Sequence, residues 1–230
     1  PKYGGAGMDS VSYVLAMEEI AKVDASAAVV MSVNNSLVCA GLEKFASEEQ
    51  KQKYLVPLAK GEVIGAFALS EPEAGSDAGA IPDTGIVCYG SYQGQEVLGL
   101  KMNFSKRWIT LAPIATVIGL AFKLYDPDGL LGDKSKSEYG ITCALIPASH
   151  EGIKIGARHN PGAPFMNGTV EGTDIFIPID WIIGGQQNAG KGWRMLMECL
   201  GVGRGISLPA LATAAGEMSY LLVGAFASVR

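Results

Sequence analysis

Hydrophobic and polar positions divide the chain into a helical part, a strand-rich part and a second helical part. Apolar residues recur at i, i+3, i+4 and i+7 from Tyr13, and Asp9 or Ser10 can cap the start of that helix. Residues 25–42 are apolar almost all round, which predicts a helix buried on several sides. The run Ser47–Gln50 predicts a capping box, and the helix that it opens should stop near residues 57–61.

The pattern changes at about Gly65, where short β-rich runs begin to alternate with Gly, Pro and Asp turns. Residues 125–138 carry turn residues and several charges, which predicts an exposed loop. Strands at this spacing without intervening helices favour an antiparallel sandwich or barrel. The predicted strands are 65–69, 86–92, 96–101, 115–124, 141–146, 153–155 and 174–177.

Helical character returns after Gly190, and residues 207–229 predict another long helix. This last helix has an apolar face, and nothing that follows it in the sequence can cover that face. We therefore expect an α+β protein that is part of something longer. The predicted domains are the end of an N-terminal helical domain (1–62), a middle β domain (63–186) and the start of a C-terminal helical bundle (187–230).

Composition narrows the function. The 230 residues are 48% hydrophobic with a net charge of −5 and no basic stripe, so nucleic acid is not an expected partner. Four scattered cysteines without a CxxC pair predict reduced thiols in the cytosol, and the two histidines lack neighbours that would form a metal site. The apolar runs are interrupted by polar residues, so we expect no membrane span and no leader peptide.

The most informative run is GAFALSEPEAGSDAGAI at 65–81. A strand-like stretch ends at Ser70 and Glu71, and Gly75 and Ser76 follow, where the backbone can approach a ligand closely. The residues alone leave a second interpretation open, which is an ordinary strand followed by a polar loop.

A second run, KRWIT at 106–110, places Trp108 and Thr110 on the same side of a strand. An indole beside a hydroxyl can bracket a heteroaromatic ring, because the indole supplies contact area and the hydroxyl supplies one hydrogen bond. The alternative is a tryptophan packed in the core beside a β-favouring threonine.

Taken together, these runs resemble the acyl-CoA dehydrogenase family. The run at 65–81 is similar to the family's first signature, and KRWIT is similar to its second flavin-contact segment. The resemblance extends over PKYGGAGMDSVSYVLAMEEIAKVD, DIFIPIDWIIGG and GKGWRMLMECLGVGR, and so covers almost the whole chain. Residues 109–133 and 140–148 look specifically like the large bacterial FadE-type branch.

The resemblance implies FAD as cofactor and acyl-CoA as substrate, which is oxidised to trans-2-enoyl-CoA as the first step of fatty acid β-oxidation. In the family, a glutamate removes the α-proton while a hydride leaves the β-carbon for the flavin. Thr110 matches a residue near flavin N5, and Ser76 and Arg204 match positions near the substrate. The residues that match family flavin contacts, here called the predicted flavin wall, are Phe67, Leu69, Ser70, Gly75, Ser76, Trp108, Ile109 and Thr110.

The catalytic base is not among the matched residues. Some relatives carry a glutamate just before the arginine that Arg204 matches, but this chain has Gly203 there. We therefore expect the base beyond Arg230 and expect this chain alone to be inactive and poorly soluble. The resemblance also implies electron-transfer flavoprotein as acceptor, a homo-oligomer built through the C-terminal bundle, and a location in the cytoplasm or at the inner membrane. Two alternatives stay open, an acyl-CoA oxidase and a non-catalytic flavin- or CoA-binding module.

Overall fold

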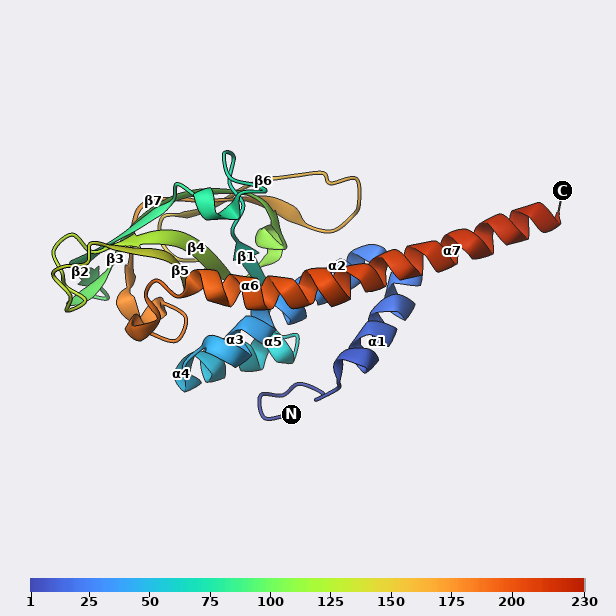
Figure 1. Cartoon of the computed structure of the whole chain (residues 1–230), viewed down its shortest axis with the longest axis horizontal. Coiled ribbons are helices and arrows are strands. Elements are labelled where there is room, and N and C mark those ends of the chain that lie inside the picture. The colour runs from blue at the N-terminus through green and yellow to red at the C-terminus, as the bar shows by residue number, and fades with distance from the viewer. Residues whose placement is uncertain (230) are drawn as a thin grey trace.

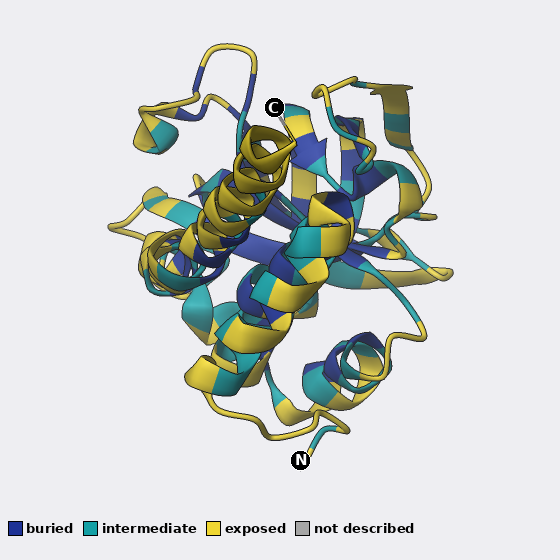
Figure 2. Cartoon of the chain, turned by 90° about the vertical axis from the view of Figure 1, so that its right-hand side faces the viewer, coloured by how far each residue is buried: buried dark blue, intermediate teal, exposed yellow. Residues whose placement is uncertain are grey.

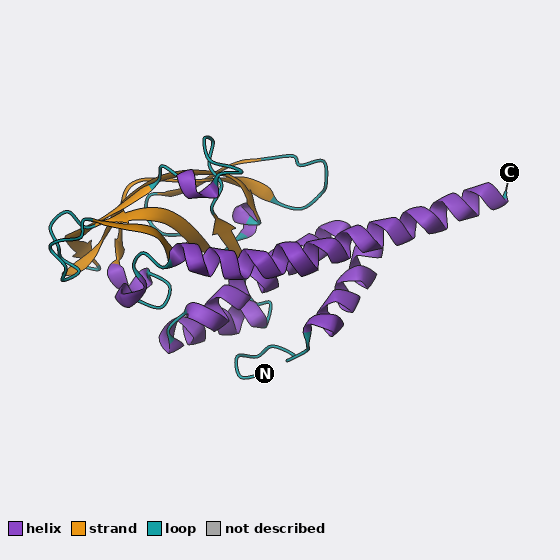
Figure 3. Cartoon of the chain, viewed as in Figure 1, coloured by secondary structure: helices purple, strands orange, loops and turns teal. Residues whose placement is uncertain are grey.

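The computed structural model describes residues 1–229, and it confirms the predicted α+β organisation. A curved sheet forms one side of the molecule, and helices from both ends of the chain pack against the other (Figure 1, Figure 3). The α-helices are α1 (Ser10–Val23), α2 (Ala25–Met31), α3 (Ala40–Phe45), α4 (Glu48–Gln50), α5 (Val56–Ala59), α6 (Gly192–Val202) and α7 (Leu208–Ser228). Three π-helical segments join them into longer helices: η1 (Ser32–Cys39), η2 (Lys51–Leu55) and η7 (Gly203–Ser207).

The helix starts follow the local sequence signals. The Asp9 carboxylate accepts a hydrogen bond of 2.8 Å from the Ser12 amide, which caps α1. The capping box between Ser47 and Gln50 is present in both directions, as predicted. The helix that begins at this capping box ends with α5 at Ala59, inside the predicted range of residues 57–61.

The predicted burial of the second helix on several sides is confirmed. The helix runs from Ala25 to Phe45, and between Ala28 and Leu42 only Asn35 is exposed. Its middle part, η1, packs against α5, α6 and η7, and its apolar residues belong to more than one cluster of the core.

The sheet contains seven strands in the order β1-β4-β2-β3-β7-β6, with β5 on the other edge of β4. Four of the strand pairs are antiparallel, but β1 and β2 both pair in parallel with β4. The prediction of a purely antiparallel sheet is therefore wrong in this detail. The strands are β1 (Gly65–Ala68), β2 (Thr84–Tyr92), β3 (Gln95–Thr110), β4 (Val117–Tyr125), β5 (Glu138–Pro147), β6 (Ile153–Arg158) and β7 (Asn167–Pro178).

Two strands are much longer than predicted. Strand β3 continues past the expected end at residue 101 to Thr110, and β7 begins seven residues before the expected start at residue 174. They pair with each other along this extra length, with register shifts after Met102 and after Lys106. Polar residues and bulges interrupt the apolar alternation there, so the sequence pattern predicted strand character at residues 106–110 but not the continuous strands β3 and β7.

Two apolar clusters hold the sheet. One lies on its inner face and includes Leu100, Phe122 and Ile177; the other lies between the sheet and the helices and includes Leu42, Leu58 and Leu145. Figure 2 shows this buried centre, whereas the C-terminal half of α7 is exposed. Gln50 joins helix to sheet, since its buried amide donates to the carbonyls of Asp180 and Ile182 and accepts from Gly184.

Helix α7 continues α6 along nearly one line and projects away from the sheet (Figure 1). Its outer half exposes apolar side chains, among them Tyr220, Leu222 and Val223. By length and composition alone, Gly192–Ser228 and Ala25–Phe45 could cross a membrane, a test that core helices of soluble proteins also pass. Oligomer formation through this part of the chain stays a prediction.

Candidate functional site

The chain that leaves β1 turns tightly at the position of the first signature run. The Glu71 amide donates to the Ala74 carbonyl at 3.1 Å, which closes the turn. Gly75 and Ser76 follow on the surface, and a Cβ added to Gly75 would meet nothing within 4 Å. The backbone at Gly75 is therefore uncrowded, and its contact with a ligand stays a prediction.

The structure brings the two signature runs together. The Arg107 amide donates to the Ser70 carbonyl at 3.0 Å, although β1 and β3 are not neighbours in the sheet. Strand β3 pairs with β2 only up to Asn103, opposite Thr84. Its remaining residues therefore lie beyond the start of β2, where the turn after β1 can reach them.

A β-bulge presents Trp108 to the surface. Lys106 pairs with Val170 and Ile109 pairs with Gly168, so β3 carries one residue more than β7 between these points. Trp108 adopts φ of 60°, a left-handed conformation that is strained for a bulky side chain. The indole is 50% exposed, and Ile109 beside it is buried in the core.

Three charged side chains are buried where the two runs meet, and we call Glu71, Asp83 and Lys106 the buried triad. The Lys106 ammonium is fully buried and lies 2.6 Å from Glu71 Oε1 and 2.6 Å from Asp83 Oδ2. It also donates to the Leu69 carbonyl at 3.1 Å. Asp83 in turn accepts from the Ser105 amide, so the triad ties the turn after β1 to β3.

The triad holds two carboxyl groups and one cation. Burial and the neighbouring Asp83 carboxyl together raise the pKa of Glu71 to about 7, although Lys106 opposes the shift. Glu71 therefore binds its proton more tightly in the folded protein than in the unfolded chain.

This shift predicts that stability falls as pH rises. The free energy of unfolding should decrease between pH 4.5 and about pH 7, because the folded state loses the Glu71 proton only near the upper value. Relative to Glu71→Gln, the wild type should lose about 3 kcal/mol across that window. Urea titrations at several pH values measure this difference, with Glu96→Gln on the surface as control. If the free energies of unfolding of wild type and Glu71→Gln changed with pH in parallel, the raised pKa of Glu71 would be contradicted.

The predicted flavin wall divides into surface and core residues. Trp108, Gly75 and Ser76 are exposed, and Thr110 and Ser70 are half-buried. Leu69 and Ile109 are buried in the two apolar clusters, and Phe67 is half-buried against one of them. Arg204 is exposed on η7, and among residues 1–229 no hydrogen bond or ion pair joins it to either run.

The buried triad and the partners of Trp108 were not predicted from the sequence. Lys106 was visible as a charge at an inward strand position after Met102 and Phe104, and Glu71 as an acid directly after a buried strand. No local sequence pattern marked His159 and Asn167. They lie about 50 residues after Trp108 in the sequence and reach it only because β3 pairs with β7.

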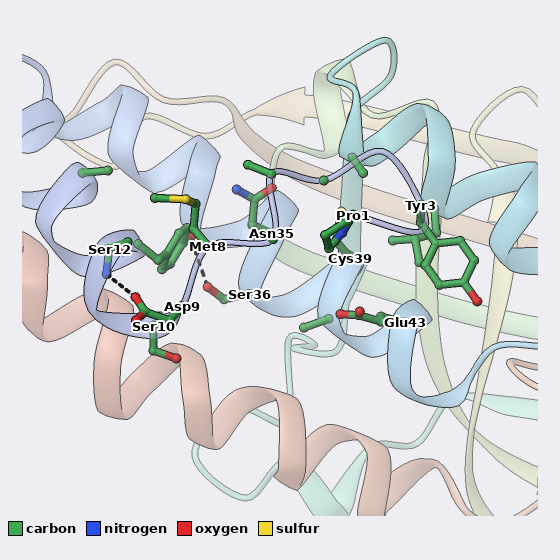
Figure 4. Close-up of a pocket in the computed structure, with 18 residues that line it drawn as sticks. Pro1, Tyr3, Met8, Asp9, Ser10, Ser12, Asn35, Ser36, Cys39 and Glu43 are labelled. Carbon is green, nitrogen blue, oxygen red and sulfur yellow. Dashed lines mark hydrogen bonds between the residues drawn. The ribbon is translucent and has the colours of Figure 1, made fainter.

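A cavity lies elsewhere, between the N-terminal segment and the helix formed by η1 and α3 (Figure 4). It measures about 710 Å³, and no residue of the predicted flavin wall lines it. Among its lining groups is Cys39, whose pKa burial raises to about 12. That thiol stays protonated at neutral pH and is therefore a poor nucleophile.

The surface at Trp108 fits a flat aromatic cofactor. An exposed indole stands on a strained backbone, and the Thr110 hydroxyl accepts one hydrogen bond, from Asn167 at 3.2 Å. Among residues 1–229, no acceptor takes the Thr110 hydroxyl hydrogen. The second run therefore offers an exposed indole and an unused donor, and the first run offers an open glycine backbone, groups that can contact an isoalloxazine ring.

Comparison with known proteins identifies the family of the chain. Residues 1–62 match the N-terminal domain and residues 66–174 match the middle domain of acyl-CoA dehydrogenases. The chain therefore belongs to the acyl-CoA dehydrogenase family and carries its N-terminal and middle domains.

Individual relatives extend beyond the chain. The short-chain specific acyl-CoA dehydrogenase of Clostridium acetobutylicum is 36% identical over 221 residues, which cover 95% of this chain and 53% of that protein. Protein HemX of Proteus mirabilis is 55% identical over 106 residues, 46% of this chain and 61% of its own length. The solved butyryl-CoA dehydrogenase of Megasphaera elsdenii superposes with a TM-score of 0.78 at 32% identity, over 94% of this chain and 53% of that one. The chain thus spans little more than half of the relatives that match most of it.

Proposed function

We propose that the protein containing this chain oxidises acyl-CoA thioesters to trans-2-enoyl-CoA with FAD. The observation that carries the proposal is the junction of the two signature runs, where Ser70 accepts a hydrogen bond from Arg107 and Trp108 lies exposed beside Thr110. FAD, when bound, supplies the hydride acceptor for this reaction.

The residues of this chain have binding and electrostatic roles in that proposal. Trp108 provides a face for the ring, and the Thr110 hydroxyl provides a donor where negative charge develops during reduction. The open backbone at Gly75 and Ser76 lines the side from which the thioester approaches. Ile109, buried below, keeps Trp108 and Thr110 on the surface side of β3.

We place the catalytic base outside the described residues. Glu71 belongs to the first run, but it is buried and paired with Lys106, so it is not available to take a substrate proton. Relatives are about twice as long as this chain, which leaves room for a base in the remaining part.

The acyl chain length and the electron acceptor are separate parts of the proposal. The FadE-type resemblance favours medium to long chains, whereas the Clostridium acetobutylicum relative is named as short-chain specific. We propose acyl-CoA thioesters in general as substrates and electron-transfer flavoprotein as acceptor.

The four free cysteines support a cytoplasmic location, where thiols stay reduced.

The experiment is turnover of the full-length holoprotein with butyryl-CoA and with palmitoyl-CoA, measured as enoyl-CoA formed with a dye acceptor under argon and with oxygen alone. We expect turnover with the dye and little hydrogen peroxide. Peroxide in proportion to product would instead identify an oxidase. No enoyl-CoA with either substrate would refute the proposal. Residues 1–230 expressed alone should form no product, because the base is missing.

A further inference from the structure

A chain of hydrogen bonds leads from His159 to the proposed flavin contact. His159 Nδ1 lies 2.8 Å from Asn167 Oδ1. The Asn167 amide nitrogen donates to the Trp108 carbonyl at 3.1 Å and to Thr110 Oγ1 at 3.2 Å. Asn167 is only 5% exposed, and it stands opposite Thr110 at the start of β7. One buried amide thus holds both surface residues of the second signature run.

The direction of each hydrogen bond follows from the Trp108 carbonyl. A carbonyl oxygen can only accept, so the Asn167 group that faces it must be the NH₂ group. The Asn167 oxygen therefore faces His159, and His159 Nδ1 must carry a proton to donate to it. This fixes the neutral imidazole as the Nδ1–H tautomer.

The same reasoning fixes the role of Thr110. Its oxygen accepts from Asn167, so its own hydrogen must point elsewhere, and among residues 1–229 no acceptor takes it. The hydroxyl is left as a donor toward the open surface. If Asn167 were absent, the hydroxyl could rotate and donate to the Trp108 carbonyl or to water instead.

The histidine also contacts the indole directly. The His159 and Trp108 rings lie 4.2 Å apart between centroids at 44°, and the His159 amide donates to the Asn167 carbonyl. Trp108 has a strained backbone that needs support from its neighbours. His159 supports the ring, and Asn167 supports the peptide that carries it.

We propose that Asn167 and His159 are positioning residues for the flavin. Asn167 holds Thr110 as a hydrogen-bond donor to the cofactor, and His159 holds Asn167 in the orientation that does so. This inference rests on the proposed function, because it assigns the receiver of the Thr110 hydrogen to the flavin.

Two measurements on the full-length holoprotein test it: the midpoint potential of the bound FAD, and the His159 tautomer by ¹⁵N NMR. We expect the Nδ1–H tautomer. Asn167→Ala should lower the midpoint potential, as Thr110→Val should. In the Thr110→Val background, Asn167→Ala should cause no further decrease, because both changes remove the same hydrogen-bond donor, the Thr110 hydroxyl. His159→Asn, whose amide can replace Nδ1–H, should keep the potential, whereas His159→Leu should lower it.

His150→Asn is the matched control, since His150 is also half-buried, bonds to a carbonyl at Phe176 and packs on Trp181. It should leave the potential unchanged. An Nε2–H tautomer, an unchanged potential in Asn167→Ala, or additive shifts in the double variant would overturn the inference while FAD binding stays intact. A wild-type protein that binds no FAD would overturn the proposed function, and the positioning role with it.

Discussion

Replacing Lys106 with methionine is expected to lower the free energy of unfolding by about 3–5 kcal/mol, because it leaves two carboxyl groups buried without a cation. Lys106 is fully buried and lies 2.6 Å from a carboxylate oxygen of both Glu71 and Asp83. Equilibrium unfolding in urea measures the loss. Lys101→Met is the matched control on the same strand: Lys101 pairs with Asp174 at the surface, and such exposed pairs contribute less than about 1 kcal/mol.

A compensated variant separates charge from packing. Adding Glu71→Gln and Asp83→Asn to Lys106→Met removes the unpaired charges, and we expect it to restore about half of the lost stability. Because the triad ties the turn after β1 to β3, the single variant should also weaken FAD binding more than the compensated one. Equal stability for both variants would show that the charges of the triad matter little.

Replacing Thr110 with valine is expected to slow reduction of the bound flavin by acyl-CoA about 10²–10³-fold, the usual cost of removing one donor from a site of developing charge. Valine keeps the shape and the β-branched backbone preference of threonine, so the fold should be retained. Stopped-flow absorbance under anaerobic conditions measures the rate.

Thr116→Val supplies the control for this substitution. Thr116 is an exposed threonine just before β4, and its change should leave the reduction rate unaltered. An unchanged rate in Thr110→Val, with FAD still bound, would remove Thr110 from the proposed site. A loss of FAD binding in both variants would point to a defect of folding instead.

Local sequence signals predicted the parts of this fold that depend on neighbouring residues. The Asp9 cap, the Ser47–Gln50 capping box and the turn after Leu69 each involve residues within a few positions of one another. The order of helices and strands followed from the change in hydrophobic period at about Gly65.

The features that the sequence did not predict depend on pairing between distant segments. The bulge at Trp108 requires β7 opposite β3, and the parallel contacts of β4 with β1 and β2 require the whole sheet. Asn167 reaches Thr110 only because these strands pair. No local sequence pattern specifies which residues of two distant strands pair. The contacts that hold Trp108 and Thr110 in place could therefore be identified only from the structure.

Anaerobic titration of the full-length holoprotein with acyl-CoA tests the central claim most directly. We expect the absorbance of the oxidised flavin to be lost as substrate is added, with one trans-2-enoyl-CoA formed for each FAD reduced. Bound FAD that stays oxidised in the presence of both short and long acyl-CoA would contradict it.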